Sequence, residues 1–170
     1  FRRVLFQSSE SELAGVMAHE IAHVTQRHHA RRYEEGSGSN IPVIAALIAA
    51  MVLGGQNNDI AQAALASVAA GSIQSQINFT RANEKEADRM GINILINAEF
   101  NPHGMVTFFE TMDKESRFYG ESIPEFLRSH PVNPSRIADA KNRASKYPNT
   151  TTTNSTKYSH LRNSLNILAI

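Results

Sequence analysis

Cysteine is absent from this sequence of 170 residues. Its absence excludes disulfides, thiolate zinc sites and cysteine nucleophiles, so any bound metal must be held by histidine and carboxylate side chains. A strong excess of one charge is also absent, because 17 basic residues face 16 acidic ones and the formal net charge is +1. Nothing in this balance points to a nucleic-acid partner.

A long apolar run is missing as well. The longest one, residues 41–53 (IPVIAALIAAMVL), is shorter than the roughly 20 residues that a membrane-spanning helix needs. We expect a buried or interfacial helix here. Two interpretations stay open: simple core packing, or a mobile lid or membrane-facing plug that would allow peripheral membrane contact.

No segment alternates apolar and polar residues as a half-buried strand does, so the fold class is predicted to be mainly α. The length suits one compact domain over residues 1–148, followed by a Thr-rich linker at 149–157 and an amphipathic tail at 158–170. Capping residues and apolar periodicity predict the helices. The expected caps are Ser9, Thr80, Asn101 and Asn133, and the expected helices are 11–33, 60–77, 80–97, 101–116 and 133–146.

The chemistry-bearing motif is HEIAH, in which His19, Glu20 and His23 fit the pattern HExxH. Residues four apart lie one turn above each other on a helix, so both imidazoles can reach one metal ion. Glu20 lies beside them, where it can address a metal-bound water. Apolar neighbours surround these three residues in sequence, which argues against a plain solvated face.

A third ligand is needed, because a catalytic zinc usually takes three protein ligands and keeps one position open. Glu84 and Asp88 share a face of the predicted helix 80–97, and Glu86 points away. One of the two carboxylates can bind metal while the other accepts a hydrogen bond from a ligand histidine. Gly91, one turn later on that face, would allow the HExxH helix to approach closely.

Together, HEIAH, NEKEADRMG and SHPVNPSRIADA resemble the zinc metallopeptidases that include HtpX and the CAAX prenyl proteases. The chain is most similar to their soluble periplasmic branch in Gram-negative bacteria. The resemblance implies a zincin-like domain with one Zn²⁺ per chain. It implies that His19, His23 and Glu84 are zinc ligands, that Glu20 is the catalytic base, and that Asp88 is the partner of His19.

The same resemblance places the family's His-Pro motif at His130-Pro131 and its following arginine at Arg136. Members of this branch continue into tetratricopeptide repeats, which the tail at 158–170 would begin. The family's substrate-pairing β-strand, which precedes the HExxH helix, would lie before Phe1.

His130 and Arg136 are candidate donors to the oxyanion that forms during peptide hydrolysis. His130 has a rival role, since it could become a fourth zinc ligand and displace the water. The donor role predicts that His130→Ala lowers turnover, and the fourth-ligand role predicts that it raises turnover. Of the other histidines, His28 and His29 are expected to cap the end of the HExxH helix; His103 and His160 are expected at the surface.

The expected function is a zinc-dependent endopeptidase in the periplasm. Its substrates would be misfolded or misassembled polypeptides in outer-membrane protein quality control, with the outer-membrane β-barrel assembly machinery as a partner. The alternative is a chaperone-like binding module with a silenced or self-inhibited zinc site. A purely structural zinc site is a third option, which would need His130 as the fourth ligand.

Overall fold

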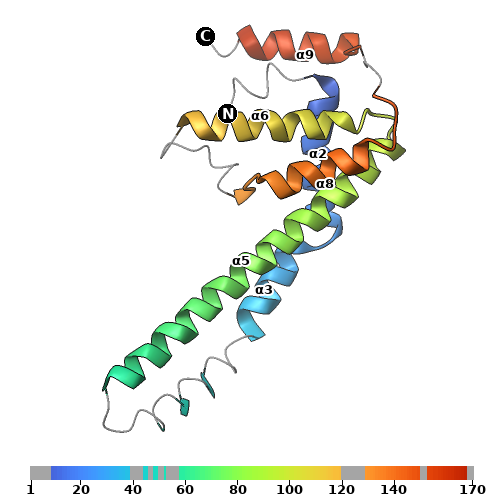
Figure 1. The fold of residues 1–170 in the computed structure, drawn as a ribbon. Helices are drawn as coiled ribbons and strands as arrows, with labels where there is room; N and C mark the ends of the chain where they lie inside the picture. The colour runs from blue at the N-terminus through green and yellow to red at the C-terminus, as the bar shows by residue number, and fades with distance from the viewer. Residues whose placement is uncertain are drawn as a thin grey trace. The chain divides into compact units, whose positions relative to one another are not determined.

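A computed structural model describes residues 9–38, 44–45, 48–49, 52, 58–119, 129–149 and 153–167. Its helices are shown in Figure 1. They are α2 Glu10–Thr25, α3 His28–Gly38, α5 Asn58–Asn97, α6 His103–Tyr119, α8 Pro134–Ala144 and α9 Thr156–Ile167. The described residues contain no strand, so the prediction of a mainly α fold is confirmed.

The apolar segment 41–53, predicted as a core helix or a lid, lies mostly outside the described residues. Five of its side chains are described, and all five are exposed, including the large apolar ones of Ile44, Ile48 and Val52. No helix in the described part of the chain combines the length and the apolar character that crossing a membrane requires.

The chain divides into two compact units, which are described separately. The first unit comprises residues 1–22 and 85–170, and the second comprises residues 23–84. The first unit holds the hydrophobic core. Its buried members come from α2, α5, α6 and α8, and they are Ala18, Ile92, Leu95, Met105, Val106, Phe108, Phe109, Met112, Ala140 and Ala144.

Two glycines let the helices of the first unit approach closely. A Cβ at Gly91 in α5 would lie 3.2 Å from the backbone nitrogen of His19 and 3.3 Å from the carbonyl carbon of Ala18. A Cβ at Gly104 in α6 would overlap the carbonyl group of Ser11. The predicted close approach at Gly91 is therefore confirmed, and it sets the distance between α5 and the histidine-bearing turn of α2.

Hydrogen bonds join the start of α9 to the start of α2 within the same unit. The carboxylate of Glu10 accepts hydrogen bonds from the backbone nitrogen (2.6 Å) and hydroxyl (2.8 Å) of Ser155. The amide of Glu10 in turn donates to Asn154 Oδ1 at 2.8 Å. Tyr158 is buried, and this burial raises the pKa of its phenol.

Three of the predicted helix caps are confirmed by their hydrogen bonds. Asn101 Oδ1 accepts from the His103 amide at 3.0 Å. Ser9 Oγ accepts from the Glu12 amide at 3.2 Å, and Asn133 Oδ1 accepts from the Arg136 amide at 3.0 Å. The prediction for Thr80 is wrong, because it lies inside the continuous helix α5. Its hydroxyl donates to the Gln76 carbonyl at 3.0 Å, so the side chain is satisfied within the helix and does not begin a new one.

The prediction of one helix over residues 11–33 is also wrong. Helix α2 ends at Thr25 and α3 begins at His28. Arg27, between them, has a φ of 55°, in the left-handed region that a residue other than glycine seldom adopts. The helix is therefore interrupted at this turn, although neither glycine nor proline marks it.

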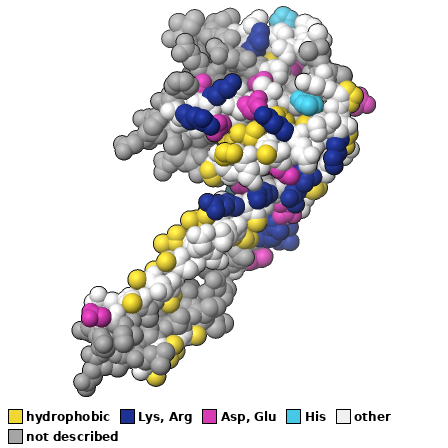
Figure 2. Space-filling model, in the orientation of Figure 1, with side chains coloured by type: hydrophobic (Ala, Val, Ile, Leu, Met, Phe, Trp, Pro, Cys, Tyr) yellow, Lys and Arg dark blue, Asp and Glu magenta, His cyan; other side chains and the backbone are white. Residues whose placement is uncertain are grey.

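In the second unit, α3 is joined to α5 by a hydrogen bond from Arg31 Nη2 to Asn83 Oδ1 at 3.2 Å. Over residues 59–82 of α5, every side chain that the structure describes is half-buried or exposed. Ile73 and Ile77 are 59% and 40% exposed, and hydrophobic side chains reach the surface in several places (Figure 2).

Candidate metal centre

Helix α2 carries the three residues of the HExxH motif. His19 and His23 are one helical turn apart, and they are 3% and 5% exposed. Burial of two polar rings in an apolar environment is unfavourable unless each ring has partners. The partners of each ring therefore indicate what the motif can do.

His19 has a carboxylate on one side of its ring. His19 Nδ1 lies 3.0 Å from Asp88 Oδ1, and the Asp88 side chain is almost fully buried. Since an ionised carboxylate can only accept, this contact favours a proton on His19 Nδ1 and leaves the lone pair of Nε2 for a metal. Asp88 thus stands where the resemblance places the partner of His19.

Asp88 is itself held by Arg136 through two parallel hydrogen bonds. Arg136 Nε donates to Oδ2 and Nη2 donates to Oδ1, both at 2.7 Å. Such a paired geometry is among the strongest that charged side chains form. It holds the buried carboxylate in the orientation that faces His19.

Arg136 makes two further contacts in the protein interior. Its Nη1 donates to the Pro131 carbonyl at 2.9 Å, and its guanidinium lies 4.9 Å from the ring centroid of Phe109. The residue is only 2% exposed. These contacts support a positioning role for Arg136, which holds Asp88 and the chain next to His130. Its predicted role as an oxyanion donor stays a prediction.

His130 lies beside both His19 and Glu20. Its Nδ1 is 3.3 Å from His19 Nε2, and the two rings are nearly perpendicular. Its Nε2 is 3.7 Å from Glu20 Oε1. Among the described residues, that buried carboxylate oxygen has no hydrogen-bond partner, although the Glu20 side chain as a whole is 43% exposed. Glu20 thus lies beside the ligand group, and its side chain as a whole is partly open to solvent.

His23 has a carboxylate on one side and a second histidine on the other. Its Nε2 lies 3.3 Å from Glu84 Oε1, and its Nδ1 lies 2.8 Å from His28 Nδ1. Glu84 is 4% exposed and His28 is 3% exposed. Glu84 therefore faces the nitrogen of His23 that points away from His28.

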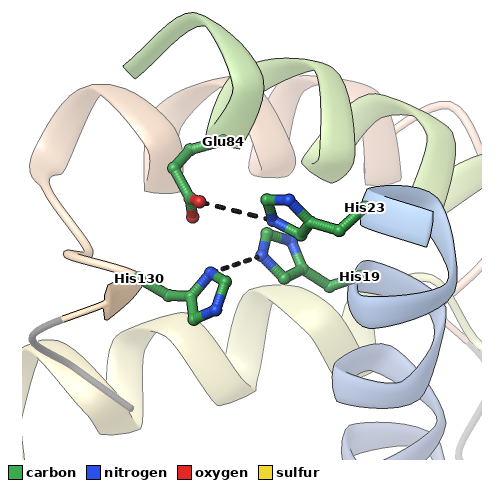
Figure 3. Close-up of side chains that lie close together, drawn as sticks. All are labelled: His19, His23, Glu84 and His130. Carbon is green, nitrogen blue, oxygen red and sulfur yellow. Dashed lines mark hydrogen bonds and ion pairs between the residues drawn. The ribbon is translucent and has the colours of Figure 1, made fainter. Parts of the chain in front are cut away.

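Four of these side chains form one group of potential metal ligands. His19, His23, Glu84 and His130 each offer one ligand atom, and these atoms all lie within 4.8 Å of one another (Figure 3). Imidazole nitrogen and carboxylate oxygen are the donors that zinc accepts when cysteine is absent. The chemistry of the donor set therefore fits a zinc ion, and it suits neither calcium nor magnesium, which prefer oxygen ligands.

Sequence reasoning missed His28, which was expected to cap a helix end. The structure buries it against His23, because the turn at Arg27 interrupts the helix between these two residues. Five residues along an unbroken helix place two side chains about 140° apart, on different faces. No signal in the sequence marks the break. His29 and His160 are exposed and His103 is half-buried, with its Nε2 3.3 Å from the Tyr147 carbonyl.

Comparison with known proteins gives a consistent family. The sequence profile described as "Peptidase family M48" matches residues 1–144. A Vibrio cholerae protein provisionally named a beta-barrel assembly-enhancing protease is 49% identical over 144 residues, which is 85% of this chain. The beta-barrel assembly-enhancing protease of Escherichia coli K12 is 43% identical over 141 residues, which is 83% of this chain. Similarity extends to the mitochondrial metalloendopeptidase OMA1 of Schizosaccharomyces pombe, at 30% identity over 128 residues, which is 75% of this chain and 35% of that protein.

The chain spans 30% and 29% of the lengths of the two bacterial relatives. The match covers the motifs that carry the ligand group, HEIAH, NEKEADRMG and the His-Pro sequence.

Proposed function

The chain belongs to peptidase family M48, and on this premise we propose that it forms the catalytic part of a zinc-dependent endopeptidase. The observation that carries the proposal is the group of four ligand atoms within 4.8 Å, with Glu20 beside it. A purely structural metal site would not need a further carboxylate next to the ligands.

His19, His23 and Glu84 would hold the zinc ion. When bound, zinc supplies a Lewis acid that lowers the pKa of water and polarises the scissile carbonyl. Glu20 takes a proton from the attacking water and passes it to the leaving amine. The Oε1 atom of Glu20 lies 3.7 Å from His130 Nε2, beside the ligand group.

The remaining residues of the motif keep the ligands in place. Asp88 holds the proton of His19 on Nδ1, and Arg136 holds Asp88 through both carboxylate oxygens. His130 Nδ1 lies 3.3 Å from the ligand nitrogen of His19. This position supports the fourth-ligand role, in which His130 competes with water for the open position of the metal.

The substrates are proposed to be misfolded or misassembled polypeptides. The two bacterial relatives are named for enhancing β-barrel assembly, which supports a role for this chain in outer-membrane protein quality control in the periplasm. The outer-membrane β-barrel assembly machinery is then the proposed partner. The described part of segment 41–53 has exposed apolar side chains, as peripheral membrane contact would require.

A second candidate function is a chaperone-like binding module with a silenced zinc site. The proximity of His130 to the other ligands favours it, because a fourth protein ligand leaves no place for water. The two functions differ in the role of Glu20: the endopeptidase needs its carboxylate as a proton acceptor, and the binding module does not.

Glu20→Gln tests the proposal directly. We expect this change to leave zinc bound and to reduce cleavage of unfolded casein by at least about 100-fold, since it removes the proton acceptor. Native mass spectrometry measures the zinc content, and a fluorescent casein assay measures turnover. Glu86→Gln, a change on α5 outside the ligand group, is the control and should retain activity. Undiminished cleavage by Glu20→Gln would contradict the mechanism; a zinc-loaded wild-type chain that binds casein without cleaving it would favour the binding module.

A further inference from the structure

The turn between α2 and α3 brings a second histidine against a proposed zinc ligand. His28 Nδ1 lies 2.8 Å from His23 Nδ1, the ring centroids are 4.7 Å apart, and the rings are nearly perpendicular at 79°. Both residues are buried. The backbone of the turn is fixed on both sides, because the Arg27 amide donates to Val24 and the Arg31 amide donates to Arg27.

Two ring nitrogens at 2.8 Å must share one proton, with one nitrogen donating and the other accepting. His23 Nε2 faces Glu84 and belongs to the ligand group. If Nε2 gives its lone pair to zinc, the proton of the neutral ring must sit on Nδ1. His23 then donates to His28 Nδ1, and His28 carries its own proton on Nε2. The opposite arrangement would place a proton on His23 Nε2 and block that nitrogen.

The two ligand histidines thus have acceptors of different kinds. The Nδ1 of His19 faces the Asp88 carboxylate, and the Nδ1 of His23 faces a neutral imidazole. An acceptor behind a ligand histidine fixes its ring orientation and its tautomer, whatever its chemical type.

We infer that His28 is a positioning residue, which accepts the Nδ1 proton of His23 and so keeps His23 Nε2 free to bind zinc. The inference rests on the metal site of the proposed function. It assigns no contact with substrate to His28. It also gives the left-handed turn at Arg27 a role, because an unbroken helix would carry His28 to a different face.

The test measures zinc affinity in variants that separate the accepting atom from the bulk of the ring. His28→Phe keeps a ring without an acceptor, and we expect it to weaken zinc binding by about 10- to 100-fold. His28→Asn places an amide oxygen near the position of Nδ1, and we expect it to retain most of the affinity. His29→Phe is the matched control, because His29 is the exposed neighbour of His28, and it should bind zinc as the wild type does.

Competition with a chromophoric chelator measures the dissociation constant for zinc alone, and circular dichroism of the metal-free variants verifies that they are folded. Loss in His28→Phe with retention in His28→Asn supports the inference. Equal loss in both variants, or wild-type affinity in His28→Phe, overturns it and leaves the proposed function standing. A wild-type chain that binds no zinc overturns both.

A measurement on the zinc-loaded wild type keeps the inference testable if His28→Phe does not fold. Long-range ¹H–¹⁵N NMR of the histidine side chains should show a proton on His23 Nδ1 and none on His28 Nδ1. A coupling between these two nitrogens across the hydrogen bond should also be visible. A proton on His28 Nδ1 would overturn the inference.

Discussion

Helix α5 runs through two different environments. In its last part, residues 85–97, one face is buried, and Ala87, Ile92 and Leu95 are at most 2% exposed. Over residues 59–82, every side chain that the structure describes is half-buried or exposed. The backbone is helical throughout.

This difference separates two sources of helix stability. The last part of α5 is stabilised by packing in the core of the first unit. The earlier part depends on backbone hydrogen bonds and on a composition rich in alanine, which has the highest helix propensity. Glu84 and Asp88 stand where the buried face begins, so a proposed ligand and the partner of His19 are placed by one helix.

The largest expected difference comes from removing apolar side chains in the two parts. Leu95→Ala should lower the free energy of unfolding by about 2–5 kcal/mol, because it leaves a cavity in the core. Ile73→Ala should change it by less than about 0.5 kcal/mol, because Ile73 is 59% exposed. Urea denaturation followed by circular dichroism compares them. Equal losses would show that the earlier part of α5 is packed as well as the last part.

Each part of α5 contains a glycine, and replacing the two glycines by alanine should change the free energy of unfolding in opposite directions. Nothing lies within 4 Å of a Cβ at Gly71, so Gly71→Ala should raise the free energy of unfolding by up to about 1 kcal/mol through helix propensity. Gly91→Ala should lower it, because the cost of overpacking against the backbone of α2, about 1–3 kcal/mol, outweighs that gain. Thermal unfolding of both variants decides this, and a stabilising Gly91→Ala would mean that α2 can move away freely.

The smallest expected effect on stability comes from an ion pair at the surface, next to the last part of α5. Asp139 in α8 accepts a hydrogen bond from Arg143 at 2.9 Å and lies 3.6 Å from Arg89 of α5. The hydrogen bond with Arg143, assisted by both positive charges, lowers the pKa of Asp139. A lowered folded-state pKa contributes stability above the unfolded value of about 3.9, and this contribution is lost as the pH falls through the folded-state pKa.

Asp139→Asn should therefore reduce the drop in Tm between pH 6 and pH 3. Arg89→Gln should reduce it less, because Arg143 remains. An unchanged drop in Asp139→Asn would show that this pair does not contribute to acid stability.

Local signals account for what could be predicted of the fold. The mainly α class follows from the absence of alternating strands, and the caps at Ser9 and Asn133 follow from side chains that accept backbone protons over three residues. Thr80 failed as a cap because the same hydroxyl is satisfied inside a helix. The turn at Arg27 could not be predicted, because an exposed arginine has no intrinsic preference for a positive φ.

For the site, the sequence by itself determined which residue types are available and which stand at helical spacing. Because cysteine is absent, the expected metal ligands were the histidines of HExxH and a carboxylate such as Glu84. A four-residue spacing places two side chains on one face of a helix wherever that helix lies in the fold. The resemblance already pointed to Asp88 as the partner of His19, and the tertiary structure alone decided that His28 lies behind the ring of His23. Asp88 is 69 residues from His19, and His28 reaches His23 only because the helix breaks. Neither distance in space follows from a distance along the chain.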